Sequence, residues 1–170
     1  MTDPKHPPSG LDRRSFLKGT GLAAAATTVV ASAGAAPAAE DNAPQSFGPE
    51  AIDIKLDVDG KSIAAKIEPR VTLLDALRDY LGVTAAKRVC DRGTCGACTV
   101  LIDGKAVYAC SVLAIEAQGS KITTARGLMN GDSLHPVQEA FWEKDASQCG
   151  FCTPGFVTAC AAVLAKNPNA

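Results

Sequence analysis

Hydrophobic and polar residues alternate regularly in two neighbouring stretches of the chain, residues 51–58 and 61–67. A period of two is typical of a half-buried β-strand, with apolar side chains on one face and polar ones on the other. Asp59-Gly60, which separates the stretches, is a frequent hairpin turn. The sequence therefore predicts that the folded region opens with a β-hairpin.

The hydrophobic period changes after this hairpin, because Leu74, Leu77 and Leu81 follow helical spacing. Thr72-Leu73-Leu74-Asp75 has the form of a capping box with Asp in place of the usual Glu. We expect a helix from about Leu73 to Leu81. Its apolar stripe must be buried, so it should pack across the hairpin.

A second hairpin is predicted further along, with strands at residues 99–102 and 106–109 joined by Asp103-Gly104. Residues 111–119 fit a helix or a strand equally well. A short strand is expected at residues 121–124.

Two helices are predicted in the last part of the chain. The first spans residues 133–144, with Ser133 as its cap and Pro136 in its first turn. Thr153-Pro154 is interpreted as the cap and first turn of the second, which Asn167-Pro168 ends. The fold class is therefore α+β, with a mixed domain at residues 51–127 and a helical unit at 128–170.

Residues 1–39 have the organisation of a cleavable signal peptide. Arg13-Arg14 precedes Phe16-Leu17-Lys18, a mildly apolar run follows, and small residues close the segment. Paired arginines in this context indicate the twin-arginine export route to the periplasm. The apolar run is too rich in Ala, Gly and Thr for a stable membrane anchor, although an uncleaved amphipathic helix is an alternative. Residues 40–50 are a linker by composition.

Composition narrows the class of protein. The chain has 170 residues, of which 46% are hydrophobic, and a net charge of -1, which suits one or two small globular domains. Aromatic residues make up only 5%, and no basic patch is interleaved with them. Nucleic-acid binding is therefore not expected.

The strongest chemical signal is a group of cysteines spaced C-x4-C-x2-C and followed by a more distant cysteine. This is the plant-type pattern for a [2Fe-2S] cluster, in which four thiolates hold two irons. Gly93 and Gly96 give the loop access to positive φ, and their amides could approach the sulfurs. The second hairpin would return the fourth thiolate towards the others. The four residues are Cys90, Cys95, Cys98 and Cys110.

A disulfide framework and a structural zinc site fit this loop less well than a cluster. Disulfides are possible in an exported protein, but the chain has seven cysteines, an odd number, and disulfides would not require glycines between them. Structural zinc usually shows two C-x2-C knuckles, whereas this loop begins with C-x4-C. The cluster is therefore the favoured interpretation.

A second cysteine group, Cys149 and Cys152, lies at the start of the last predicted helix. A helix N-terminus favours thiolate, so this C-x2-C is a metal or redox element. A thioredoxin-like pair would need a preceding strand, and here a helix precedes it. Cys160 fits a buried structural thiol better than a ligand, because it falls on an apolar helix face. His135 fits a surface or capping role better than a ligand role.

The loop from Cys90 to Thr99-Val100, together with Cys110 and the segment Gln148-Cys-Gly-Phe-Cys-Thr-Pro-Gly155, resembles the iron-sulfur subunit of the molybdenum hydroxylases. This is the family of xanthine dehydrogenase and aldehyde oxidoreductase, and with its leader the chain looks most like a periplasmic aldehyde dehydrogenase subunit. The resemblance covers residues 50–166. It implies a β-grasp, plant-type ferredoxin-like domain with one [2Fe-2S] cluster and a four-helix domain with another.

The resemblance also implies roles for individual residues and partners. The first four cysteines would bind the cluster farther from molybdenum, and Cys149 and Cys152 the nearer one. Gln148 would touch the molybdopterin held by a large partner subunit, although it could also be a cap or a surface residue. Electrons would pass from molybdenum through this non-catalytic subunit to an FAD-binding subunit or another acceptor.

The sequence departs from the family pattern in two ways. Val89 stands where a Gly usually precedes the first ligand. The Cys-x-Cys pair that completes the second cluster is not in these 170 residues, so we expect an incomplete helical domain and one complete cluster site. The rival functions are a stand-alone ferredoxin-type electron carrier and a structural metal or disulfide-bonded interaction module.

Overall fold

The structure is a computed structural model, and it describes residues 46–169. The expected signal peptide and the first part of the linker lie outside the described residues. The strands are β1 (Ile52–Val58), β2 (Lys61–Ile67), β3 (Thr99–Ile102), β4 (Lys105–Tyr108) and β5 (Lys121–Thr123). The helices are α2 (Leu73–Asp75), η2 (Ala76–Tyr80), η3 (Ala109–Ser111), η4 (Ala114–Ala117), α3 (Pro136–Glu143) and α4 (Thr153–Lys166).

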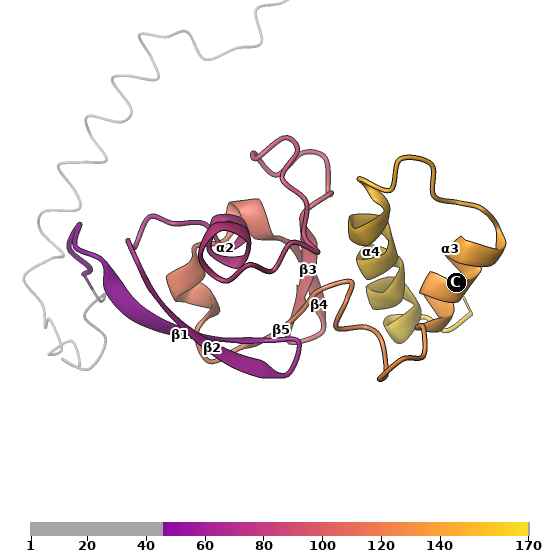
Figure 1. The fold of residues 1–170 in the computed structure, drawn as a ribbon, viewed down its shortest axis with the longest axis horizontal. Helices are drawn as coiled ribbons and strands as arrows, with labels where there is room; N and C mark the ends of the chain where they lie inside the picture. Colours follow the sequence, from indigo (N-terminus) through magenta and orange to yellow (C-terminus); the bar gives the residue numbers. More distant parts are fainter. Residues whose placement is uncertain (1–45, 170) are drawn as a thin grey trace, which may run out of the picture. The chain divides into compact units, whose positions relative to one another are not determined.

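The five strands form one mixed sheet in the order β2-β1-β5-β3-β4 (Figure 1). Both predicted hairpins are present, since β1 pairs antiparallel with β2 and β3 with β4. The short strand β5 joins them at the centre, parallel to β1 and antiparallel to β3. The ambiguous segment before β5 contains η4, a single 3-10 turn.

The predicted first helix is present, but its winding changes after one turn. Thr72 Oγ1 accepts from the backbone N–H of Asp75 at 3.2 Å, as a cap should. The reciprocal half of the expected capping box is missing, because the Asp75 carboxylate pairs with Arg88 instead. From Ala76 the helix widens to π-type, and the N–H of Leu81 donates to the Ala76 carbonyl at 3.0 Å.

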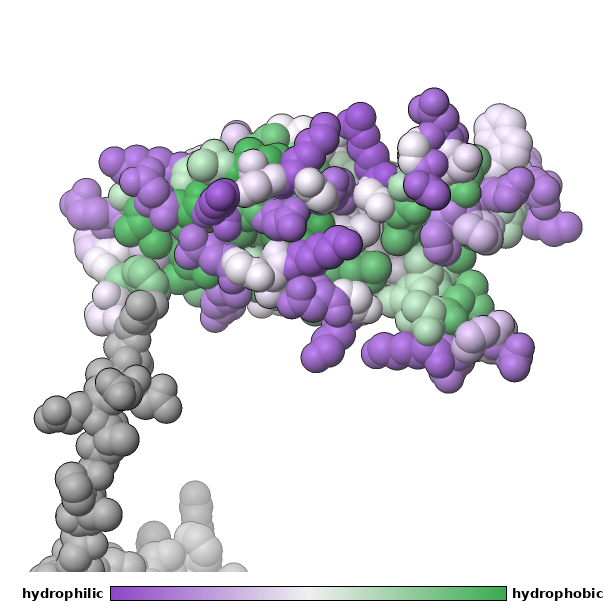
Figure 2. All heavy atoms as spheres, turned by 90° about the horizontal axis from the view of Figure 1, so that it is seen from below, coloured by the Kyte–Doolittle hydropathy of each residue, from purple (hydrophilic) through white to green (hydrophobic). Residues whose placement is uncertain are grey.

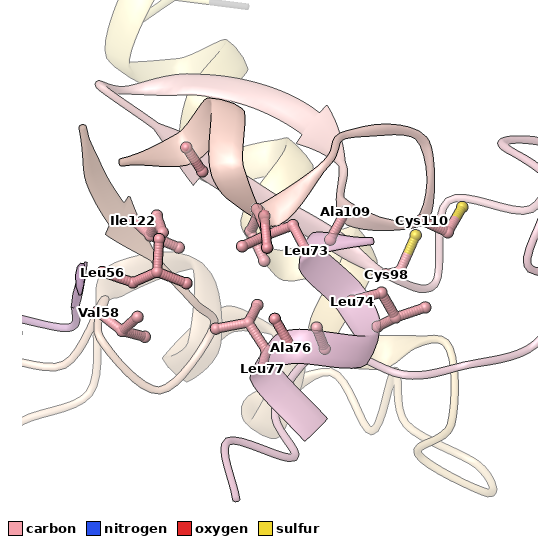
Figure 3. Close-up of a cluster of buried hydrophobic side chains, with 14 of the residues drawn as sticks. Leu56, Val58, Leu73, Leu74, Ala76, Leu77, Cys98, Ala109, Cys110 and Ile122 are labelled. Carbon is pink, nitrogen blue, oxygen red and sulfur yellow. The ribbon is translucent and has the colours of Figure 1, made fainter. Parts of the chain in front are cut away.

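The core lies between this helix and one face of the sheet (Figure 3). Leu56 from β1 and Ile122 from β5 face Leu73 and Leu77, and all four side chains are fully buried. Because the helix covers one face of a five-stranded mixed sheet, the domain is a β-grasp. The sulfurs of Cys98 and Cys110 lie at one end of this core, so the sheet itself positions them (Figure 3).

Two of the predicted caps in the helical part were wrong. His135, not Ser133, caps α3, because its Nδ1 accepts from the N–H of Val137 at 3.2 Å. Ser133 instead exchanges two backbone hydrogen bonds with Asn130, which places it in a turn before the helix. The N-cap of α4 is Cys152, so Thr153 is the first helical residue rather than the cap.

The two helices bury little of their apolar surface. Val137 and Val157 form a small core between them. Phe156 and Val163 on α4 are 57% and 51% exposed, and hydrophobic atoms reach the surface in this region of Figure 2. Among residues 46–169, no helix is long and apolar enough to cross a membrane.

Candidate metal centre

The cysteine loop is shaped by residues in the left-handed region of backbone conformation. Gly93 and Gly96 have φ values of +68° and +74°, as the sequence predicted. Asp91 also has a positive φ, +54°, which Asp tolerates better than most residues. These three reversals turn the chain back on itself between the first and third cysteines.

The segment that leads into the loop is held against the first helix by two arginines. Arg88 Nη2 lies 2.5 Å from Asp75 and 2.6 Å from Asp79, and the hydrogen bond that it donates to Asp79 is the main reason why its pKa is raised. Arg78 Nη1 donates to the Ala86 carbonyl at 2.7 Å. These contacts fix the position from which the loop departs.

The four cysteines of the predicted cluster lie as two neighbouring pairs. Cys95 is adjacent to Cys90 and contributes, after the backbone N–H groups, to lowering its pKa. Cys98 and Cys110 are also neighbours, and they are only 2% and 8% exposed. One pair is therefore at the surface and the other at the edge of the core.

A single peptide segment connects the two pairs. The N–H of Gly93 donates to Cys110 Sγ at 3.2 Å, and the next N–H along the chain, that of Thr94, donates to Cys90 Sγ at 3.4 Å. The N–H of Cys95 also donates to Cys90 Sγ at 3.4 Å. Cys110 thus points into the loop, which the cluster interpretation requires.

The two pairs differ in electrostatics. Hydrogen bonds from the backbone N–H groups of Arg92, Thr94 and Cys95 lower the pKa of Cys90 to about 6. Burial raises the pKa of Cys98 to about 11. A metal ligand must be a thiolate, so binding at Cys98 must displace a firmly held proton, whereas Cys90 is prepared for it.

This donor set fits a binuclear cluster better than a single ion. Among residues 46–169, no three His, Cys, Asp or Glu side chains converge on one point in the way a single metal ion needs. A [2Fe-2S] cluster needs only two thiolates on each iron, which is the arrangement of two cysteine pairs. All seven cysteines lie in the described part, and none forms a disulfide.

The second cysteine group lies at the start of α4, as predicted. Cys149 and Cys152 are both exposed, and Gly150 between them has a φ of +74°. Gln148 is also exposed, so its expected contact would have to come from another molecule. These residues line a hollow of about 300 Å³. Ser147 and Thr153 flank the two cysteines in the sequence, and their hydroxyl groups are 3.2 Å apart.

Gly155, in the first turn of α4, joins the two cysteine groups, and the sequence reasoning missed it. It packs directly on the cluster loop, and a Cβ there would lie 2.3 Å from the carbonyl oxygen of Gly96 and 3.0 Å from Ala97 Cα. A glycine inside a helix is unfavourable, so its presence is a sequence signal of close backbone approach. Cys160, expected to be buried, is only partly buried beside Val157.

A loop of four paired cysteines on a β-grasp sheet, with a further C-x2-C at a helix packed on that loop, defines an iron-sulfur protein of the plant-ferredoxin class. Residues 56–124 match the 2Fe-2S iron-sulfur cluster binding domain family. Residues 124–170 match a second [2Fe-2S] binding domain family. Residues 10–30 match the twin-arginine translocation pathway signal sequence, which indicates export.

Comparison with individual proteins is more specific. The chain is 42% identical over 162 residues to the aldehyde oxidoreductase iron-sulfur-binding subunit PaoA of Escherichia coli O157:H7, covering 94% of this chain and 69% of that protein. It is 42% identical to the xanthine dehydrogenase iron-sulfur-binding subunit of the same organism, covering 69% and 73%. The crystal structure of quinoline 2-oxidoreductase from Pseudomonas putida 86 superposes with a TM-score of 0.67 at 41% identity, covering 70% and 74%. The chain belongs to the iron-sulfur subunits of the molybdenum hydroxylase family.

Proposed function

We propose that Cys90, Cys95, Cys98 and Cys110 hold one [2Fe-2S] cluster through which the chain relays single electrons. The observation that carries this proposal is that two consecutive N–H groups of the loop, those of Gly93 and Thr94, donate to the sulfurs of Cys110 and Cys90. Cys98 and Cys95 are the neighbours of these two cysteines. When bound, the cluster supplies a centre that accepts and releases one electron at a time.

The chain's own residues stabilise the negative charge that a thiolate-bound cluster carries. The backbone N–H groups of Thr94 and Cys95 donate to the Cys90 sulfur, and that of Gly93 reaches Cys110. Such hydrogen bonds favour the charged thiolates, and they favour the reduced state further because it carries one more negative charge. The buried pair excludes water on one side, while the exposed pair leaves the other side open to an electron acceptor.

Cys149 and Cys152 are proposed to supply two of the four thiolates of a second cluster, so that these 170 residues hold half of that site. Both sulfurs are exposed beside a hollow, and they lie at the N-terminal end of a 14-residue helix, where thiolate is favoured. Gln148, on the same exposed loop, is proposed to contact the molybdopterin of a partner subunit. The direct packing of Gly155 on the cluster loop would keep the two centres close.

We infer that the partners are a large molybdenum-cofactor subunit, where substrate is oxidised, and an FAD-binding subunit that accepts the electrons. The relatives named above are subunits of an aldehyde oxidoreductase and of a xanthine dehydrogenase, which supports such an assembly. The export signal supports a periplasmic location. The alternative, a stand-alone ferredoxin-type carrier, predicts that the chain purifies without large molybdenum and flavin chains.

The ligand assignment is tested by single substitutions in the full chain. Cys90→Ser and Cys110→Ser should each abolish the visible absorbance and the reduced-state EPR signal of the cluster. Cys160→Ser is the matched control, because Cys160 packs beside Val157 rather than in the loop, and it should retain both signals. A Cys110→Ser protein with a full cluster spectrum would refute the assignment.

The iron content of a protein made of these 170 residues tests the half-site. Metal analysis should give about two irons per chain, because one cluster held by four thiolates contains two irons. About four irons per chain would mean that the second site is complete, and the proposal that these residues hold only half of it would be wrong.

A further inference from the structure

Ser111 is a polar residue beside the cluster loop whose role is not explained by the ligand set. It follows Cys110 at the end of η3, a 3-10 turn that continues directly from β4. Its Oγ lies 3.8 Å from Cys110 Sγ, within the range of a hydroxyl–sulfur hydrogen bond. Cys110 is 8% exposed whereas Ser111 is exposed, so the hydroxyl lies on the solvent side of a nearly buried sulfur.

The direction of this hydrogen bond follows from the chemistry of the bound state. In the free thiol form, either the sulfur or the oxygen could donate. Once Cys110 is a metal-bound thiolate it has no proton, so the Ser111 hydroxyl must be the donor. A hydrogen bond to an ionised acceptor is stronger than one between neutral groups.

The cluster loop leaves room for the Ser111 side chain at this position. A Cβ added to Gly93 would lie 2.7 Å from Ser111 Oγ, so the hydroxyl occupies the space that the missing side chain leaves. The N–H of the same glycine donates to Cys110 Sγ at 3.2 Å. The Gly93 amide and the Ser111 hydroxyl therefore reach the same sulfur, that of Cys110.

We propose that Ser111 is a positioning residue for electron transfer, whose hydroxyl donates to the Cys110 thiolate and raises the reduction potential of the cluster. The inference rests on the proposed function, in that Cys110 must be a ligand. On reduction the cluster gains one electron and no proton, so its negative charge increases by one. A donor at a ligand sulfur stabilises the more negative state more strongly, which makes reduction easier.

The proposal is tested by the midpoint potential of the cluster in the full chain, measured by dithionite titration followed by EPR. Ser111→Thr keeps the hydroxyl, and Ser111→Val has nearly the same shape without it. Relative to wild type, Ser111→Val and Ser111→Ala should lower the equilibrium constant for reduction about threefold or more, which is about 28 mV for a one-electron couple. Ser111→Thr should stay close to wild type. Ser62→Ala, an exposed serine on β2, is the distant control.

The potentials of the Ser111 variants show whether the hydroxyl, the shape of the side chain or neither affects the cluster. Equal potentials in the Thr and Val variants would overturn the proposal, because shape rather than the hydroxyl would then set the potential. Loss of the cluster in both the Ala and the Val variants would assign Ser111 a structural role and would also overturn it. A wild-type chain that binds no [2Fe-2S] cluster would refute the proposed function, whereas a normal cluster with an unchanged potential would refute only the role of Ser111.

Discussion

Gly155→Ala is a small change at the point where α4 meets the cluster loop. The added Cβ would lie 2.3 Å from the Gly96 carbonyl oxygen, and real Cβ contacts are essentially never closer than 3.0 Å, so the two backbones must separate by at least 0.7 Å. The carbonyl cannot easily turn away, because it accepts from Thr99 Oγ1 at 2.6 Å and from the Thr99 N–H at 3.1 Å. The strain therefore falls on the backbone of the loop or of the helix.

Two effects of opposite sign determine the magnitude. Ala is favoured over Gly inside a helix by about 1 kcal/mol. Overpacking a close contact costs about 1–3 kcal/mol, and here the cost should be about 2–3 kcal/mol, because the obstructing atoms belong to the backbone and cannot easily move aside. The expected net loss of stability is about 1–2 kcal/mol, or a decrease in Tm of roughly 3–10 °C for a domain of this size. Gly96 lies directly after Cys95, so iron retention should fall as well.

Thermal unfolding followed by circular dichroism, together with the iron content, measures both effects. Gly48→Ala is the matched control, since a Cβ at Gly48 would meet nothing within 4 Å. That variant should match wild type in both measurements. A Gly155→Ala protein that is as stable as wild type, and loaded to the same level, would show that helix propensity outweighs the contact, and the close packing inferred here would be wrong.

Two further perturbations test the parts of the fold that support the site. Asp59→Ala should lower the free energy of unfolding, measured by urea titration, by about 3 kcal/mol. The Asp59 carboxylate accepts from both the N–H and Oγ1 of fully buried Thr124 at 2.7 Å, and buried donors are costly to leave unpaired. Asp59→Asn keeps an acceptor and should lose less stability, so equal losses in the two variants would contradict this explanation. The backbone N–H of Lys121 donates to the Asp103 carboxylate and lowers its pKa in the folded state. This carboxylate therefore contributes to stability at pH values above its unfolded pKa of about 4. The contribution is lost as the pH falls through the lower pKa of the folded state. The stability difference between wild type and Asp103→Asn should therefore shrink from pH 6 to pH 2. A difference that stays constant over this range would refute the linkage.

The regular elements could be predicted because local sequence specifies them strongly. The alternation over residues 51–67 and the turn Asp59-Gly60 predicted β1 and β2 correctly. The alternation predicts these strands reliably because each strand buries one face. A strand shifted by one residue would expose its apolar side chains to solvent. The position of β5 at the centre of the sheet was not predicted, since a three-residue strand carries little pattern and its partners come from both hairpins.

Helix ends were predicted less well, because caps depend on competing contacts. Ser133 is a good N-cap by residue type, but its backbone is already committed to Asn130, and His135 takes the role through its ring nitrogen. The capping box at Thr72 is only half formed, because Arg88, thirteen residues after Asp75, attracts its carboxylate. Arg88 lies outside a local sequence window around Thr72, whereas His135 is only two residues from Ser133 and was expected to be a surface or capping residue.

The cysteine spacing predicted Cys90, Cys95, Cys98 and Cys110 as candidate ligands but not how they are paired in space, and the pairing depends on the register of the sheet. In β3 and β4, Thr99 lies opposite Tyr108, and the N–H of Ala109 donates to the Cys98 carbonyl at 3.3 Å. This register extends the ladder by one step beyond the strands and brings Cys110 beside Cys98. A slip of one residue would turn Cys110 to the opposite face of the sheet, away from the loop. The proposed ligand set therefore depends on the hairpin register as much as on the C-x4-C-x2-C spacing. Apolar residues of β3 and β4 fix this register, so they would support metal binding without contacting the metal.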